Sequence, residues 1–249
     1  MVTKTKSSGK SRVGKVVKSS RLPEGIPIPE GNGGAFGRKR KKISVPQLVI
    51  AETVITIKGT NPLLVNNKMG IAESVAERYG GQGGKTKSVS ITPTVEQAYA
   101  MAFYKMADTK FEPPSPKGRY GIPASGIKKC ICSAIRTAGF TDNAQIGLVG
   151  KSFWVMADSI GLCLIKFKKL ERDIRPVNIG SGQKTVPQMR HRPMFHDWSC
   201  DLRIRYNPGV LGPESMVNLI MHAGQYIGLC ELRAEKKQGE CGGFVVANN

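Results

Sequence analysis

The residues best suited to chemistry in this sequence are lysines that follow a run of small residues. The segment IPASGIKKCICSAIR, residues 122–136, places a serine and a glycine just before a pair of lysines. The first N–H groups of a helix lack partners within it and carry partial positive charge, so a helix that begins here can bind a phosphate. The alternative is that the segment only begins a helix whose lysines face water. The predicted contacts are Ser125, Gly126, Lys128, Lys129 and Arg136.

Two further groups of basic residues indicate the same chemistry. Residues 171–193 hold five cations and a histidine, a composition that suits a loop clamping a sugar–phosphate strand and releasing its counterions. Residues 233–243 combine cations with glycines, which permit close approach of a backbone. The predicted contacts are Arg172, Arg175, Lys184, Arg190, His191 and Arg192 in the first group, Arg233, Lys236 and Lys237 in the second, and Arg203 on a strand between them.

Trp198 and two of these arginines allow two interpretations. Trp198 can stack on a base, or its ring can anchor in the core. Arg175 and Arg192 can contact phosphate, or they can pair with Asp173 and Asp197. Both alternatives stay open at the level of sequence, and Trp198 is included among the predicted nucleic-acid contacts.

The charge balance extends this expectation to the whole chain. Lys and Arg total 38 against 18 Asp and Glu in 249 residues, which gives a net charge of +20. Residues 1–42 hold 12 of the cations and two of the acids, so this segment contributes +10 and the remainder another +10. A partner with dense negative charge is the first inference. The predicted contacts in the N-terminal segment are Arg38, Lys39, Arg40, Lys41 and Lys42.

Composition divides the chain into a basic arm and a globular domain. Residues 1–44 are rich in Ser, Gly, Lys and Pro, so we expect this arm to stay flexible until it binds a partner. Residues 45–249 carry enough apolar residues to form a core. An insertion at about 68–118 interrupts this domain, and the sequence leaves open whether it is a subdomain.

Periodicity and turn residues predict the order of the elements. Strands are expected at 48–58, 151–157, 161–169, 198–208 and 243–247. Helices are expected at 69–81, 94–108, 123–138 and 212–224, with Ser125 capping the third, and a loop at 171–193. Without insertions the order is strand, helix, strand, strand, helix, strand, the split βαβ or ferredoxin-like pattern of an α+β fold. Its two helices would cover one face of the sheet and leave the other for binding, as in RNA-recognition domains.

Several classes of protein are excluded by what the sequence lacks. It has no apolar run long enough to cross a bilayer and no secretion signal, so we expect a soluble protein of the cytoplasm or a virion, without a membrane partner. Its six cysteines lack zinc-type spacing and its three histidines are dispersed, so no metal is expected. No nucleotide-binding loop, serine-nucleophile motif or carboxylate pair occurs, so we expect no cofactor, no small-molecule substrate and no catalytic residue.

Two segments resemble a known family. IPASGIKKCICSAIR (122–136) resembles the start of a helix in the RAMP superfamily, although Lys129 stands where a glycine is usual. AGQYIGLCELRAEKKQGECGGFVV (223–246) resembles the glycine-rich loop before the last strand of the same superfamily. The superfamily includes RNA-binding backbone subunits of CRISPR effector complexes, which implies a ferredoxin-like (RRM-like) fold, RNA near the helix start and assembly into filaments. The segments RHRPMF…W and HAG…IG…E.R are also similar to uncharacterised phage-encoded proteins.

Three functions follow from these observations. The leading hypothesis is a non-enzymatic protein that binds single-stranded RNA, or less favourably DNA, through phosphate contacts with little sequence preference, and that self-associates into an oligomer or filament. The second is a structural virion protein whose basic arm neutralises a packaged genome. The third is a RAMP-type endoribonuclease, because processing members of the superfamily use a histidine among basic residues, and His191 or His196 can serve as general base.

Overall fold

Strand β1 (Ala51–Gly59) lies between two other strands in the main sheet of this computed structural model. It begins three residues after the predicted start at 48 and ends one residue after the predicted end at 58. The structure describes residues 47–67, 94–109, 113–179, 186–236 and 239–247. Contacts between residues divide the chain into Met1–Val45 and Pro46–Asn249, and every described residue belongs to the second unit. The predicted arm, the helix at 69–81 and much of the insertion at 68–118 lie outside the described residues.

The main sheet is antiparallel throughout. Its order is β3 (Gly121–Pro123), β5 (Leu162–Lys166), β8 (Ser199–Tyr206), β1 and β9 (Phe244–Val246), with β4 (Phe153–Met156) also pairing with β8. Strands β4 and β5 pair with successive parts of β8, so together they fill the position of one interrupted strand. The α+β class predicted from the sequence is confirmed.

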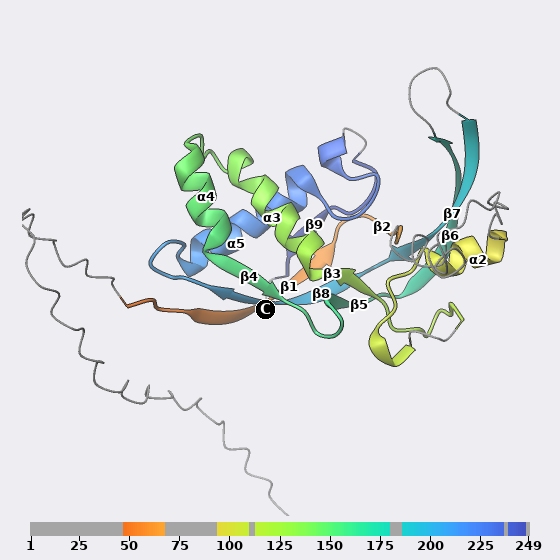
Figure 1. Ribbon diagram of the computed structural model, residues 1–249, viewed down its shortest axis with the longest axis horizontal. Coiled ribbons are helices and arrows are strands. Elements are labelled where there is room, and N and C mark those ends of the chain that lie inside the picture. Colours follow the sequence, from red (N-terminus) through yellow and green to blue (C-terminus); the bar gives the residue numbers. More distant parts are fainter. Residues whose placement is uncertain (1–46, 68–93, 110–112, 180–185, 237–238, 248–249) are drawn as a thin grey trace, which may run out of the picture. The chain divides into compact units, whose positions relative to one another are not determined.

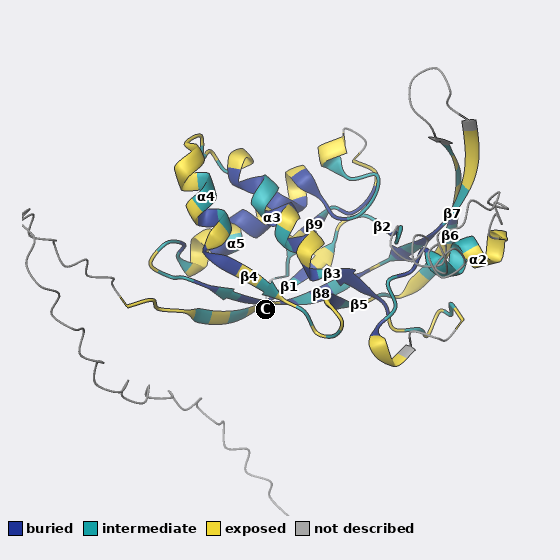
Figure 2. Ribbon diagram, in the orientation of Figure 1, coloured by how far each residue is buried: buried dark blue, intermediate teal, exposed yellow. Residues whose placement is uncertain are grey.

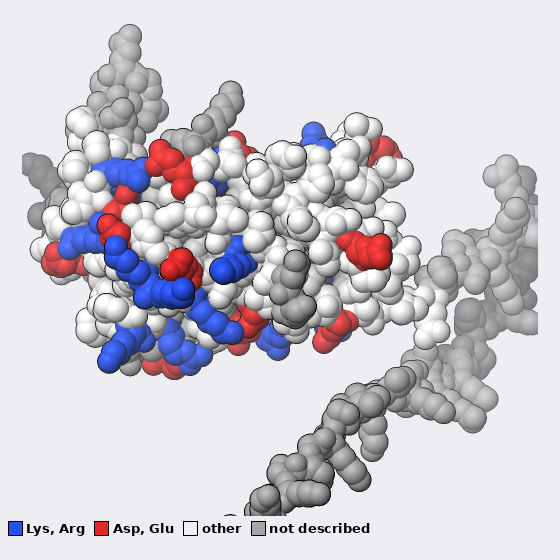
Figure 3. Space-filling model, turned by 180° about the vertical axis from the view of Figure 1, so that it is seen from behind, with Lys and Arg blue, Asp and Glu red and all other residues white. Residues whose placement is uncertain are grey.

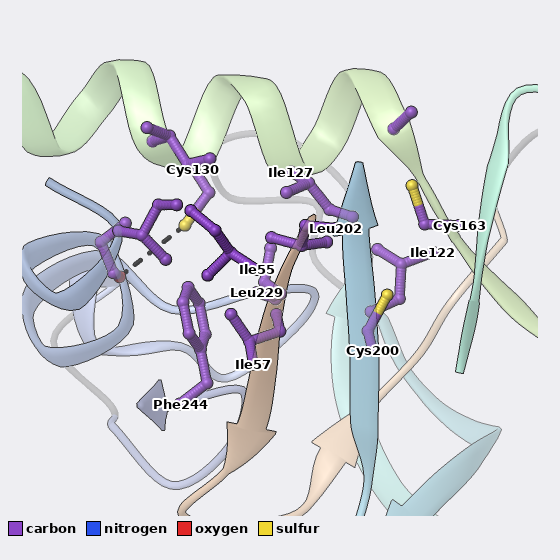
Figure 4. Packing of buried hydrophobic residues seen from close by; sticks show 14 of the residues in the cluster. Ile55, Ile57, Ile122, Ile127, Cys130, Cys163, Cys200, Leu202, Leu229 and Phe244 are labelled. Atoms are coloured by element: carbon purple, nitrogen blue, oxygen red, sulfur yellow. Dashed lines mark hydrogen bonds between the residues drawn. The ribbon is translucent and has the colours of Figure 1, made fainter. Parts of the chain in front are cut away.

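Helices cover one face of this sheet (Figure 1). They are α3 (Ala124–Thr137), α4 (Asn143–Lys151) and α5 (Pro213–His222). One side of α3 is apolar and buried, and Figure 4 shows its Ile127 and Cys130 directed toward Ile55, Ile57 and Phe244. Burial of such side chains contributes about 1.5–3 kcal/mol each, which fixes the helix on the sheet. Figure 2 shows that exposed residues lie on the side of these helices that faces away from the sheet.

The loop predicted at 171–193 is wrong, because this region forms a hairpin. Strands β6 (Lys169–Ile179) and β7 (Val186–His196) pair antiparallel, and β2 (Leu63–Leu64) pairs with β7. The prolines in this region favoured a loop, but a proline is tolerated in a strand where its nitrogen faces away from the partner strand. Pro176 and Pro193 occupy such positions opposite Met189 and Arg172.

The remaining helices differ from the prediction in length. Helix α2 (Val95–Met101) begins with a capping box between Thr94 and Gln97 and ends well before 108, where a single turn, η1 (Ala107–Thr109), follows. Helix α4 was not predicted; Asp142 caps it through the N–H groups of Ala144 and Gln145. Helix α5 continues as a π-helical segment, η2 (Ala223–Ile227), and a further turn, η3 (Ala234–Lys236), precedes β9.

Candidate nucleic-acid cleft

A cleft of about 850 Å³ joins three segments that are far apart in the sequence. Its walls are the first turns of α3, the β6–β7 hairpin and the loop from Ile227 to Glu240. Six basic and three acidic side chains line it, so the lining carries a surplus of three positive charges. The basic residues are Lys129, Arg175, Arg190, Arg192, Arg233 and Lys236, and the acidic ones are Glu231, Glu235 and Glu240.

The start of α3 forms one wall, although Ser125 does not cap it. The N-cap is Pro123, whose ring has no group to donate or accept a hydrogen bond. Ser125 is the second residue of the helix and is exposed. The N–H group of Ala124 donates to the carbonyl of Gly161 at 2.9 Å. A Cβ atom at Gly126 would meet only Pro123 at 3.8 Å, so packing does not demand a glycine there. Its missing side chain leaves this wall of the cleft open.

The two lysines of α3 point to different surroundings. Lys129 lines the cleft, with no acidic partner among the described residues. The Lys128 ammonium instead lies 5.7 Å and 5.6 Å from the ring centroids of Phe153 and Trp154. Arg136 is ten residues beyond Gly126, about 15 Å farther along the helix axis, and its guanidinium donates to Asn143 at 3.5 Å. Of the two predicted lysines, Lys129 therefore lines the cleft and Lys128 does not.

The hairpin wall is held by a buried ion-pair network. The Arg192 guanidinium donates to Asp173 at 2.8 Å and to Glu231 at 2.6 Å, and its side chain is only 5% exposed. Glu231 also accepts from the amide of Asn66 at 2.9 Å. The predicted alternative of ion pairs with nearby acids is thus realised at Asp173, because a buried guanidinium requires an opposite charge. Asp197, the other predicted partner, instead lies 3.8 Å from Lys168. The network joins both hairpin strands to the loop after α5.

Two further arginines of the hairpin, Arg175 and Arg190, differ in their ion pairs, and Arg175 alone has acidic partners among the described residues. Arg175 and Arg190 lie opposite each other across β6 and β7, where like charges repel. Arg175 pairs with Asp173 at 2.7 Å and Glu240 at 2.6 Å, and these contacts raise its pKa. Arg190 has no ion pair among the residues that the structure describes. Together with Lys129, it gives the cleft cations that an anionic ligand can neutralise.

The two histidines of the hairpin contact other hairpin residues. Arg172 donates to Nδ1 of His191 at 3.1 Å, pairs with Glu96 at 2.8 Å and lies 4.5 Å from the ring centroid of Tyr99. These contacts tie α2 to the hairpin. His196 lies 3.0 Å from Glu171, on the same strand pair. Neither histidine lines the cleft, and neither does Arg172.

The C-terminal loop forms the third wall. Arg233 donates to the carbonyl of Cys230 at 2.8 Å and pairs with Glu235, which lowers the pKa of that carboxyl. The backbone is in the left-handed region at Cys230, with φ 62°, and at Gly242, with φ 75°. A Cβ atom at Gly242 would lie 1.9 Å from the Leu229 carbonyl, so this glycine serves contact within the loop. Lys236 lines the cleft, whereas Lys184, Lys237 and Arg38, Lys39, Arg40, Lys41 and Lys42 lie outside the described residues.

Two predicted contacts lie elsewhere. Trp198 as a stacking platform is wrong, because its side chain is fully buried and its indole N–H donates to the Asn61 carbonyl at 2.9 Å. Arg203 lies on the sheet face opposite the helices, where it bonds to the Ala157 carbonyl and pairs with Asp158 at 3.5 Å. Figure 3 shows basic side chains gathered, with acids among them, toward the hairpin end of one face.

The thiols near the cleft are poor nucleophiles. Burial raises the pKa of Cys130 to about 12, and its thiol donates to the carbonyl of Gly228 at 3.2 Å. In the described part of the chain, no group of His, Cys, Asp and Glu residues is arranged to hold a metal ion.

Comparisons with known proteins give a distant likeness only. No protein-family profile and no curated protein matches this chain. Among solved structures it is similar to the crystal structure of Cmr6 from Pyrococcus furiosus, with a TM-score of 0.37 and 12% sequence identity over 81% of this chain and 100% of that one. This likeness is too distant to assign a function. No helix within the described ranges is long and apolar enough to span a bilayer.

Proposed function

We propose that this protein binds single-stranded nucleic acid in the cleft, through its phosphates, without catalysing a reaction. The observation that carries the proposal is the convergence of three cationic segments on one cleft with a surplus of positive charge. Lys129 and Arg190 provide uncompensated cations, and the first turn of α3 adds the partial charge of its N–H groups. Such a site recognises a sugar–phosphate strand with little regard for base sequence.

The sheet order supports a ferredoxin-like, RRM-like interpretation of the core. Reading β4 and β5 as one interrupted strand, the order across the sheet is β9, β1, β8, β5 and β3 with antiparallel neighbours. Along the chain, α3 lies between β1 and β4, and α5 lies between β8 and β9. We interpret this order, apart from β3, as a split βαβ fold. It favours a binding module, although the fold by itself specifies no activity.

RNA rather than DNA is proposed from the sequence resemblance of residues 122–136 and 223–246 to the RAMP superfamily. The endoribonuclease alternative loses support, because His191 and His196 contact residues of the hairpin and do not line the cleft. The virion alternative depends on the arm. The two proposals differ because one assigns nucleic-acid binding to the cations of the arm and the other to the cations of the cleft.

The decisive experiment uses the full chain and compares the removal of cations inside the cleft with the removal of a cation beside it. Binding of fluorescent single-stranded RNA, single-stranded DNA and duplex is measured by anisotropy over a salt series. The double variant Lys129→Gln/Arg190→Gln removes two cleft cations; Lys128→Gln removes one cation from the adjacent helix position outside the cleft. Each lost phosphate contact should reduce the log–log salt slope by about 0.7, so the double variant should lose about 1.4.

The outcomes separate the proposals. A shallower salt slope and weaker single-strand binding in the double variant, with Lys128→Gln close to wild type, support the cleft. Unchanged binding in the double variant would overturn it. If, in addition, replacing Arg38, Lys39, Arg40, Lys41 and Lys42 by serine abolishes binding while particles still form, the arm-bearing structural protein is the better account.

A further inference from the structure

Within the described part of the chain, one edge of β1 is paired only at its C-terminal end. Strand β9 pairs only with Ile57–Gly59, and the N–H group of Ala247 donates to the carbonyl of Thr56 at 2.8 Å. On this edge, residues 47–55 have no backbone partner among the residues that the structure describes. Figure 1 shows residues 47–50 continuing outward from the start of β1. An open edge of this kind is a template for another strand.

The side chains on this edge are apolar and nearly uncharged. Leu48 and Val49 are 63% and 60% exposed, and Val54 is 59% exposed. The only charged residue in 47–55 is Glu52, and Arg205 on the neighbouring strand compensates it at 2.8 Å. The segment contains no lysine or proline, which commonly protect such edges. A neutral, apolar edge on a protein of charge +20 suits a protein strand and not a nucleic acid.

We propose that this edge pairs antiparallel with the same edge of a second copy of the chain, centred on Ala51, so that the two main sheets become continuous. The free segment 47–55 has Ala51 at its midpoint, and antiparallel pairing of two such segments along their full length therefore places the two-fold axis there. The occupant is a second copy because the segment is complementary to itself in this register.

The backbone directions fix the register. The carbonyl of Thr56 points to the free edge, and alternate residues of a strand point the same way, so Glu52 and Val54 of β1 present their N–H and carbonyl groups there. In the proposed pairing the strand extends past Ala51, and Leu48 and Ile50 then present theirs to the same edge. Centred on Ala51, Leu48 faces Val54 of the partner and Ile50 faces Glu52, which gives about eight hydrogen bonds.

Neighbouring registers satisfy fewer groups. Centring the pair on Ile50 places Val54 opposite Pro46, which has no N–H group to donate. Centring it on Glu52 sets two carboxylates directly opposite each other, which is destabilising. In the favoured register the two Ala51 residues form a non-hydrogen-bonded pair with Cα atoms about 4.5 Å apart, a spacing that suits a small side chain.

The symmetry of this interface has a consequence for assembly. Each copy uses its free β1 edge once, and a two-fold axis closes the contact, so the product is a dimer. The filament implied by the sequence resemblance would need a different, head-to-tail surface. The inference does not depend on the proposed function, since no cleft residue takes part in the pairing.

The experiment uses the full chain, freed of nucleic acid by nuclease and high salt. Sedimentation equilibrium should give twice the chain mass of 27.0 kDa. Ala51→Cys should form an intermolecular disulfide under mild oxidation, because paired cysteines need Cα atoms about 4.4–6.8 Å apart. Val49→Cys is the matched control, since its position faces Thr53 of the partner. Wild type controls for the native cysteines.

A second variant tests the backbone hydrogen bonds. Val54→Pro removes an N–H group that has no partner within the described chain, so the monomer should keep its fold by circular dichroism while dimer dissociation becomes at least about tenfold easier. Selective cross-linking of Ala51→Cys and dissociation by Val54→Pro support the proposal. A monomer at micromolar concentration would overturn it, and so would equal cross-linking of Val49→Cys or a dimer indifferent to Val54→Pro.

Discussion

We expect removal of the Arg192 side chain to lower the free energy of unfolding substantially, because it breaks a buried ion-pair network. Its guanidinium is 5% exposed and donates to both Asp173 and Glu231. The variant Arg192→Met keeps an unbranched stem but leaves Asp173, also 5% exposed, without one of its two cationic partners. Breaking a buried ion pair costs about 3–5 kcal/mol. Because Asp173 keeps Arg175 and Glu231 keeps Asn66, we expect the lower end, about 3 kcal/mol.

Denaturant unfolding followed by circular dichroism measures this loss. The double variant Arg192→Met/Asp173→Leu removes both buried charges and should be more stable than Arg192→Met alone by about 1–2 kcal/mol. Arg205→Met is the control, since its partner Glu52 is largely exposed and the change should cost less than about 1 kcal/mol. A loss below about 1 kcal/mol for Arg192→Met would refute the reasoning that desolvation makes this network expensive to break.

Two further predictions concern glycines and acid stability. Gly126→Ala should raise the free energy of unfolding by about 0.5–1 kcal/mol, whereas Gly242→Ala should lower it by more than about 1 kcal/mol because a Cβ atom there meets the Leu229 carbonyl. The hydrogen bond from Lys166 lowers the pKa of Asp201 from its usual 3.8, so the folded state binds fewer protons than the unfolded state and loses stability as the pH falls below about 4. Asp201→Asn should therefore flatten the decline of stability between about pH 4 and pH 2, measured by thermal unfolding at each pH.

The sequence predicted the parts of the fold that depend on periodicity. Apolar residues recur at helical spacing in the predicted helix at 123–138, and Ile127, Ile131 and Ile135 are buried in α3. The alternation in 198–208 likewise predicted β8, with Leu202 and Ile204 buried. Such patterns are local, so a single chain carries them in full.

The site was predicted in part. Adjacent residues of a helix point about 100° apart, which explains why Lys129 lines the cleft and Lys128 does not. That spacing was available in the sequence and would have separated the two lysines. The pairing of Arg192 with Glu231 was not available, because it depends on how the hairpin meets a loop distant in the sequence.

The burial of Trp198 has a consequence for how this sequence can change over generations. A Cβ atom at Gly59 would lie 2.2 Å from the indole nitrogen of Trp198, so no larger residue fits at position 59 while the tryptophan is present. Replacing the tryptophan alone would empty a large part of the core, a loss of about 3–5 kcal/mol. Neither position can drift independently, and descendants of this sequence should keep or replace the two together. Surface cations face no such packing restriction. We therefore expect homologues of this protein to retain Gly59 and Trp198 more often than its surface cations.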